Sequence, residues 1–400
     1  MKKTTKLNIL TIASLVLGII MGLKFPNFMQ EISFVGTIYV NLLKLMIIPI
    51  IFTSVAVAIY GTKGTKGKIV LKTIILFVIM FVATFLITSL IVFLLDPTKG
   101  ITSFQEVAWS GSITSLKPTD IIVNLFPNNL ATMIEGNFIF ACILFAFAFG
   151  KAAMGIKDAE KIMSPLETLR DIIYRILRYI MYLTPIAVFS LIGTTIANYG
   201  TQIVGIGLKY IGIAYLCSII TLILIMILPV WIIAKVNPIT YIKRVYKVWI
   251  VTITTCSSAA TLPYTIKTCN EEFNIPEKIT NIVVPLGCTI HMCGGAVSFA
   301  LLGIFCSQLF GIEITLTTFL VMLISSTLIN MSAPGIPGGG IVLGATYLTL
   351  LNIPLSFIGL YSGIYRFLDM SYTTLNVTGD ITANILIDYQ NKKWDNVSGE

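Results

Sequence analysis

Long apolar segments separated by short polar stretches dominate the first part of the chain. Each is at least about as long as the ~20 residues that cross a ~30 Å hydrocarbon core as a helix, so each predicts a transmembrane span. The first follows Lys2, Lys3 and Lys6 and shows no small-residue cleavage site, so we expect a retained helix rather than a signal peptide. The six predicted spans lie near residues 7–24, 34–60, 72–95, 119–150, 170–198 and 203–234.

The pattern changes after Trp249, where two apolar segments are interrupted at residues 254–263 and 332–340. Proline removes a backbone donor, and consecutive glycines favour non-helical backbone, so each segment should form two half-helices that meet at an irregular tip. Longer spans with polar clusters follow at 278–309 and 352–387. Irregular backbone at membrane depth is tolerated only inside protein or beside water. Paired broken segments therefore indicate the binding site of a secondary transporter.

Five polar residues share one face of the last span. Arg366, Asp369, Thr373, Asn376 and Asp380 are spaced 3, 4, 3 and 4 residues apart, which matches the helical repeat. Ionisable groups in a membrane cost about 2.5–3.5 kcal/mol each, so they persist where they face a cavity, pair with one another or bind an ion. An Arg366–Asp369 ion pair is one interpretation. Asp380 has no cationic neighbour in its own helix, which favours a bound monovalent cation as its partner.

The span at 278–309 contains a glycine-rich interruption, Gly287 to Gly295, with the single histidine of the chain, His291. Three interpretations stay open for this side chain: a hydrogen-bonded core residue, a proton-coupling group or a ligand. One histidine without spaced cysteines makes a transition-metal site unfavourable.

Composition and charge exclude a soluble protein, because 56% of the residues are hydrophobic and only 11% are charged. The net charge of +9 does not indicate a nucleic-acid partner. With a cytoplasmic N-terminus the basic residues concentrate on inner loops, as the positive-inside rule requires. The inner loops carry Lys63, Lys66, Lys68, Lys72, Lys151, Lys157, Lys161, Arg170, Lys235, Lys243, Arg244 and Lys247, and the outer side carries Lys24, Lys99, Lys117 and Lys209.

The seven cysteines form no CxxC pair, so we expect small buried hydrophobic residues rather than disulfides or a zinc site.

Several motifs in order resemble the dicarboxylate/amino acid:cation symporter family, the glutamate transporter homologues, over nearly the whole chain. Residues 41–52 resemble the second-helix motif of that family, and 125–137 its fourth-helix pattern. Residues 257–263 are similar to the tip of its first hairpin and 335–338 to the tip of its second. The most specific match is Asn-Val-Thr-Gly-Asp at 376–380.

The resemblance implies an all-α polytopic membrane protein with eight transmembrane helices, two re-entrant helical hairpins and inverted repeats. It also implies a homotrimer in the cell membrane, with both termini cytoplasmic, that works by an elevator movement. The implied divisions are scaffold helices 1–2 at 1–71, transport-domain helix 3 at 72–97, scaffold helices 4–5 with an extracellular loop at 98–200, the rest of the transport domain at 201–388 and a cytoplasmic tail at 389–400.

Carried over by position, Asp369 would hold the α-amino group of an amino acid substrate. Asn376 and the backbone near Ser258 and Gly335 would hold its α-carboxylate, with Thr373 lining the pocket.

The resemblance also implies two sodium sites built largely from backbone oxygens. The first would use the carboxylate of Asp380 with backbone oxygens of Gly287, His291 and Asn376, and the second would use backbone oxygens of Thr289, Asn330, Met331 and Ala333.

Two departures concern the substrate. Members that carry acidic substrates have an arginine one turn beyond the aspartate, where this chain has Tyr372, and a threonine where it has Gly295. A phenol does not replace the bidentate guanidinium. Arg366 lies six residues before Tyr372, about 9 Å along the axis at ~1.5 Å per residue, so it is not a simple substitute. We therefore expect a neutral amino acid as the substrate, with Tyr372 in the pocket, and an acidic amino acid or C4-dicarboxylate as the alternative.

A third departure concerns the coupling ions. A further sodium site of the family uses polar side chains at positions that are His291, Cys293, Phe77, Met80 and Phe81 here. We expect this site to be absent, unless His291 contributes a proton, which its ordinary pKa near 6.5 permits. Sodium is thus the expected coupling ion and a proton the alternative.

Two other classes of function compete with a transporter. An intramembrane enzyme would need Ser257 or a cysteine opposite His291, and no HExxH or GxSxG motif is present in the sequence. A channel is a stronger alternative than an enzyme. Two hairpins around a polar stripe, however, indicate a site that closes around its substrate rather than an open pore. We therefore expect a symporter and not an enzyme.

Overall fold

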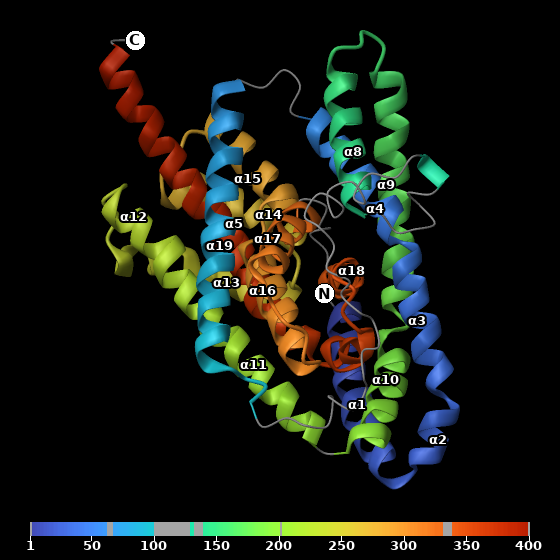
Figure 1. Ribbon diagram of the computed structural model, residues 1–400. Coiled ribbons are helices and arrows are strands. Elements are labelled where there is room, and N and C mark those ends of the chain that lie inside the picture. The colour runs from blue at the N-terminus through green and yellow to red at the C-terminus, as the bar shows by residue number, and fades with distance from the viewer. Residues whose placement is uncertain are drawn as a thin grey trace.

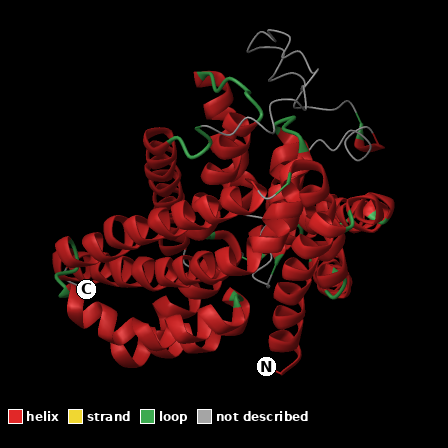
Figure 2. Ribbon diagram, turned by 90° about the horizontal axis from the view of Figure 1, so that it is seen from below, coloured by secondary structure: helices red, strands yellow, loops and turns green. Residues whose placement is uncertain are grey.

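The computed structural model describes residues 2–61, 67–99, 129–131, 139–200, 202–330 and 338–398. Their regular secondary structure is helical, and no strand occurs among them (Figures 1 and 2). The prediction of an all-α protein with several apolar helices is confirmed.

The N-terminal helices follow the predicted spans with one correction. They are α1 (Lys2–Lys24), α2 (Pro26–Glu31), α3 (Ser33–Leu45), α4 (Ile47–Tyr60) and α5 (Gly67–Leu95). The predicted span 34–60 is not one helix, because it breaks at Met46. Pro49 explains the break, since its ring would clash with the carbonyl of Leu45 in a continuous helix.

The next helices are α8 (Ile139–Met154), α9 (Glu160–Met181) and α10 (Thr184–Tyr199). Most of the predicted span 119–150 before α8 lies outside the described residues. The span predicted at 170–198 is not one straight helix, because α9 and α10 meet at an angle of 53°. Pro185 lies in the first turn of α10 and would clash with the carbonyl of Met181, where α9 ends.

The predicted span 203–234 is one continuous rod. It consists of α11 (Gln202–Thr221), a π-helical turn η1 (Leu222–Ile227) and α12 (Leu228–Ile232). The wider turn precedes Pro229, where it accommodates the proline ring without a sharp kink.

The two predicted broken segments form two helical hairpins. The first consists of α13 (Pro238–Thr255) and α14 (Ser258–Lys267), followed by the π-helical turn η2 (Thr268–Glu272). Cys256 interrupts it in the left-handed region, at φ 48° and ψ 43°, and the Ser257 hydroxyl caps α14 by accepting from Ala260 N at 3.2 Å. The second consists of α17 (Leu316–Asn330) and α18 (Gly339–Leu350), and its tip at 331–337 lies outside the described residues.

The remaining helices form the centre of the molecule. They are α15 (Glu277–Ile290), α16 (Cys293–Leu309), the short turn η3 (Leu355–Phe357) and α19 (Ile358–Ser398). Helix α16 is buried along almost its whole length. Helix α19 packs against α11, α13, α15 and α16, and α5 packs along α16 (Figure 1). Four residues of the polar stripe are therefore buried, namely Asp369, Thr373, Asn376 and Asp380, whereas Arg366 is partly exposed.

A second set of helices packs beside this centre. Helix α1 lies along α10, and α4 lies against α8 and α9 (Figure 1). The α1–α10 contact is close because glycines occupy it: a Cβ on Gly22 would lie 2.6 Å from the carbonyl oxygen of Gly193.

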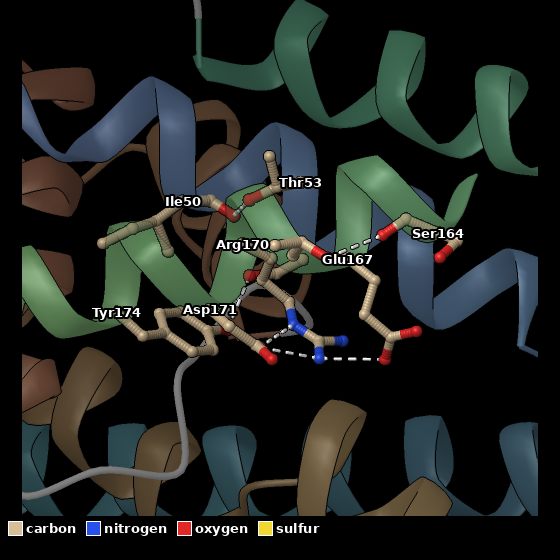
Figure 3. A network of polar contacts seen from close by, with 9 residues as sticks. Ile50, Thr53, Ser164, Glu167, Arg170, Asp171 and Tyr174 are labelled. Carbon is tan, nitrogen blue, oxygen red and sulfur yellow. Dashed lines mark hydrogen bonds and ion pairs between the residues drawn. The ribbon is translucent and has the colours of Figure 1, made fainter. Parts of the chain in front are cut away.

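Helix α9 carries a polar network on the same side of the molecule (Figure 3). The Arg170 guanidinium contacts Glu167 at 3.0 Å and Asp171 at 2.9 Å. The Tyr174 hydroxyl joins α9 to α4 through a 2.6 Å hydrogen bond to Ser54. This network is separate from the stripe in α19.

Three described helical stretches are long and apolar enough to span a membrane: Ile69–Leu95, Gly205–Ile232 and Glu277–Leu309. The bent pair α9–α10 would add a fourth if it crosses as one span. The eight spans predicted from the resemblance stay a prediction.

Candidate substrate and cation site

One pocket lies beside the polar face of α19. Its walls come from the start of α14, the break between α15 and α16, and both helices of the second hairpin. Among the predicted site residues it collects Ser258, Asn330, Asp369, Tyr372, Thr373 and Asn376. These residues are up to 118 positions apart in the chain (376 − 258), so the fold brings together what the sequence keeps separate.

Asp369 is buried in this pocket and oriented by two hydrogen bonds. Its Oδ2 accepts from the backbone N–H of Gly338 at 3.0 Å, and its Oδ1 accepts from the Thr373 hydroxyl at 3.1 Å. Gly338 has φ 78°, a conformation that glycine adopts without strain. The carboxylate thus joins α19 to the described end of the second hairpin.

Asn376 lies one helical turn beyond Thr373 and faces the N-terminus of α16. Its Oδ1 accepts from the backbone N–H of Gly294 at 2.7 Å. The first N–H groups of a helix have no partner inside the helix, so this side chain satisfies one of them.

The glycine-rich interruption at 287–295 is an unwound break. Helix α15 ends at Ile290, and His291 and Met292 are non-helical, with φ/ψ of −114°/114° and −139°/87°. With its amide oriented to suit both partners, Asn330 Nδ2 donates to Met292 O at 3.2 Å and its Oδ1 accepts from Met292 N at 3.3 Å. The end of α17 is therefore tied to the break.

Asp380 and His291 meet in the protein interior, close to this break. His291 Nδ1 lies 2.9 Å from Asp380 Oδ1, and the two side chains are 0% and 2% exposed. On its other side, His291 Nε2 lies 3.1 Å from the sulfur of Cys293. The ring stacks on Phe77 with centroids 4.3 Å apart and an interplanar angle of 13°. His291 is therefore a buried, hydrogen-bonded residue, and its proton-coupling and ligand interpretations stay predictions.

Gly287 is packed against Asp380. A Cβ on Gly287 would collide with the Asp380 carboxylate and would lie 3.0 Å from Phe77 Cζ. The backbone of α15 therefore approaches the carboxylate as closely as only glycine permits.

The structure describes only some of the remaining predicted cation ligands. Thr289 lies in the last turn of α15, but its side chain is exposed and its hydroxyl donates to Leu286 O at 2.8 Å. Met331 and Ala333 lie outside the described residues, as does Gly335, which was predicted to bind the substrate carboxylate.

Arg366 does not form the ion pair with Asp369 that the sequence left open. No ion pair between these two side chains occurs among the described residues; the guanidinium instead donates to Thr254 O at 2.9 Å, near the end of α13. Arg366 therefore contacts the first hairpin next to its tip.

Tyr372 lines the pocket and is buried. Its hydroxyl forms no hydrogen bond with a described residue, although the Ser298 side chain lies nearby. The Ser298 hydroxyl is bonded to Tyr361 at 2.7 Å.

Several residues of the site were not singled out as site residues from the sequence. Cys256, Met292, Ser298 and Tyr365 also line the pocket, and Phe77 covers His291. These are ordinary core residue types on separate helices, so no local pattern marks them. The interruption at 287–295 was the one signal that pointed toward Met292.

Comparison with known proteins identifies the family of this chain. A family model described as the sodium:dicarboxylate symporter family matches residues 7–390. A proton/glutamate-aspartate symporter from Bacillus subtilis (strain 168) is 25% identical, and the alignment covers 98% of both chains. A proton/sodium-glutamate symport protein from Geobacillus stearothermophilus is 27% identical over 95% of this chain and 92% of the relative. C4-dicarboxylate transport protein 1 from Ralstonia nicotianae (strain ATCC BAA-1114 / GMI1000) is 26% identical over 96% and 92%. The chain therefore belongs to the sodium:dicarboxylate symporter family, whose members are cation-coupled membrane transporters and not enzymes.

Proposed function

We propose that this protein couples sodium influx to the uptake of a small neutral amino acid. The observation that carries the proposal is the charge of the pocket. Among the described lining residues, Asp369 is the one acidic residue, and no lysine or arginine is present. A second carboxylate on the substrate would be buried without a cationic partner, which is costly.

The α-amino and α-carboxylate groups of an amino acid would match the polar groups of the pocket. The Asp369 carboxylate would bind the α-amino group, and the Asn376 amide would bind the α-carboxylate. The backbone at Ser258, in the first turn of α14, and at Gly335 would complete the carboxylate site, because helix N-termini favour anions. Thr373 and Tyr372 would line the side-chain end of the pocket.

The coupling ion would bind at the α15–α16 break. Asp380 would supply the charge, and Gly287, His291 and Asn376 would supply backbone oxygens. A second site would use backbone oxygens of Thr289, Asn330, Met331 and Ala333. Oxygen ligands of this kind suit a hard cation such as Na⁺.

The mechanical part of the proposal follows the resemblance. The second set of helices, 1–71 and 98–200, would form a trimeric scaffold, and residues 72–97 and 201–388 would carry the substrate across the membrane by an elevator movement. Residues 389–400 would form a cytoplasmic tail, with the N-terminus on the same side.

A second candidate function is symport of an acidic amino acid or C4-dicarboxylate, with H⁺ or Na⁺. The names of the relatives favour it, since they describe glutamate, aspartate and C4-dicarboxylate transport.

Uptake into proteoliposomes distinguishes these candidates. Labelled serine, alanine, aspartate and succinate would be offered with Na⁺ and H⁺ gradients imposed separately. We expect Na⁺-driven uptake of a neutral amino acid. Aspartate uptake as strong as serine uptake would refute the proposed specificity, and uptake that follows pH and ignores Na⁺ would move the coupling to protons.

A further inference from the structure

Asp380 presents its two carboxylate oxygens to different surroundings. Oδ1 accepts a hydrogen bond from His291 Nδ1 at 2.9 Å. The contacts that the described residues make with this carboxylate are at Oδ1, and none of them donates a hydrogen bond to Oδ2. One oxygen is thus held in place while the other is left for a further partner.

The His291 ring is itself packed against two neighbouring helices. Phe77 stacks on it at 4.3 Å. A Cβ on Gly379 would lie 2.5 Å from His291 Cε1, so α19 packs directly against the ring edge. Helices α5 and α19 therefore leave the imidazole little freedom to rotate away from Asp380.

The hydrogen bonds also define the tautomer of the neutral ring. When Asp380 is ionised, as cation binding requires, its carboxylate accepts and cannot donate, so the proton is assigned to Nδ1. Nε2 is then an acceptor, and the Cys293 S–H at 3.1 Å is its donor. A neutral ring with this tautomer adds no charge that would compete with a cation at Asp380.

We propose that His291 is a positioning residue for the coupling cation: its Nδ1–H holds the Asp380 carboxylate against the unwound α15–α16 break, with one oxygen directed to the ion. The ion binds Asp380 and backbone oxygens, and the imidazole acts through Asp380. This role rests on the proposed function, in which Asp380 binds the cation.

Three substitutions of His291 separate hydrogen bonding from packing. In His291→Asn the amide nitrogen occupies the place of Nδ1 and keeps the bond to Asp380. In His291→Gln the amide nitrogen reaches the place of Nε2 instead, and His291→Leu removes both bonds. Tyr39→Phe is the matched control, because it removes a buried 3.0 Å hydrogen bond to Thr184 between α3 and α10.

The measurements are the half-saturating Na⁺ concentration for uptake into proteoliposomes and the Na⁺-dependent rise in Tm of the detergent-solubilised protein, with choline chloride as the ionic-strength control. Groups that orient a metal ligand typically contribute about 10- to 100-fold in affinity. We expect the Gln and Leu variants to require at least about tenfold more Na⁺, with the substrate KM at saturating Na⁺ unchanged. The Asn variant should stay within about threefold of wild type, and Tyr39→Phe should lower Tm without changing the Na⁺ requirement.

The outcomes distinguish this role from the function on which it rests. A wild-type protein whose uptake and Tm ignore Na⁺ would overturn the proposed sodium coupling. A Na⁺-responsive wild type with an equally responsive Gln variant would overturn the positioning role alone. An Asn variant as defective as the Gln variant would also overturn it, even if His291→Leu does not fold.

Discussion

Adding one methyl group at Gly287 should damage cation coupling more than substrate binding. The new Cβ would lie 2.6 Å from Asp380 Cγ, and ordinary carbon contacts lie at about 3.5–4.0 Å. The carboxylate must therefore retreat by about 1 Å. This movement would stretch its 2.9 Å bond to His291 beyond hydrogen-bonding distance.

The expected size of the effect combines three terms. Overpacking of a core costs about 1–3 kcal/mol, and loss of the hydrogen bond adds about 1 kcal/mol. Replacing glycine by alanine in a helix returns about 1 kcal/mol. The net destabilisation is about 1–3 kcal/mol, and displacement of a metal ligand should reduce cation affinity about 10- to 100-fold.

The assay is Na⁺-dependent uptake together with Tm in detergent. Gly212→Ala in α11 is the control, since a Cβ there has no heavy atom within 4 Å. Both variants gain helix propensity, but only in Gly287→Ala does the new Cβ collide with a carboxylate, that of Asp380. A Gly287→Ala protein with wild-type Na⁺ dependence and unchanged Tm would refute the proposed contact between this backbone and the cation ligand.

Three further changes test other parts of the structure. Tyr372→Arg should raise aspartate uptake and lower serine uptake, because it adds a cation to a pocket whose described lining has none. Competition assays with both amino acids measure this preference, and an unchanged preference would contradict the prediction. Gly22→Leu should lower the stability by about 1–3 kcal/mol, because its Cβ would lie 2.6 Å from Gly193 O. Thermal unfolding measures this loss of stability, and a wild-type Tm would contradict the close α1–α10 contact. Arg366→Met should slow uptake a few-fold, since the hydrogen bond to Thr254 O is lost. A partly exposed charge contributes about 1 kcal/mol or less to stability, so Tm should change little. A large fall in Tm with normal uptake would assign Arg366 to stability alone.

Local chemistry made much of the architecture predictable. The interruption after Thr255 and the start of α18 at Gly339 occur where small residues and glycines interrupt the apolar pattern. The same reasoning could have located the breaks at Met46 and between α9 and α10, because Pro49 and Pro185 were visible in the sequence. Hydrophobicity alone predicts a continuous span in both places, whereas the prolines mark where each helix ends.

The site was only partly predictable. The spacing in α19 placed Asp369, Thr373 and Asn376 on one face, and they line one pocket. The helical pattern offers Asp380 no cationic neighbour on its own helix, whereas the described structure places His291, 89 positions away, beside it. Helical periodicity relates neighbours on one helix and carries no information about which other helix packs opposite.

By itself the sequence determined the membrane class, the helical elements, the two broken segments and the polar face of the last helix. Each of these follows from hydrophobicity or backbone chemistry within about 20 residues. Only the tertiary structure decided that His291 meets Asp380, that Asn330 meets the break at Met292 and that Arg366 turns to Thr254. These contacts depend on how α13, α15, α17 and α19 pack against one another, because burial forces each polar group to find a partner on whichever helix lies opposite it.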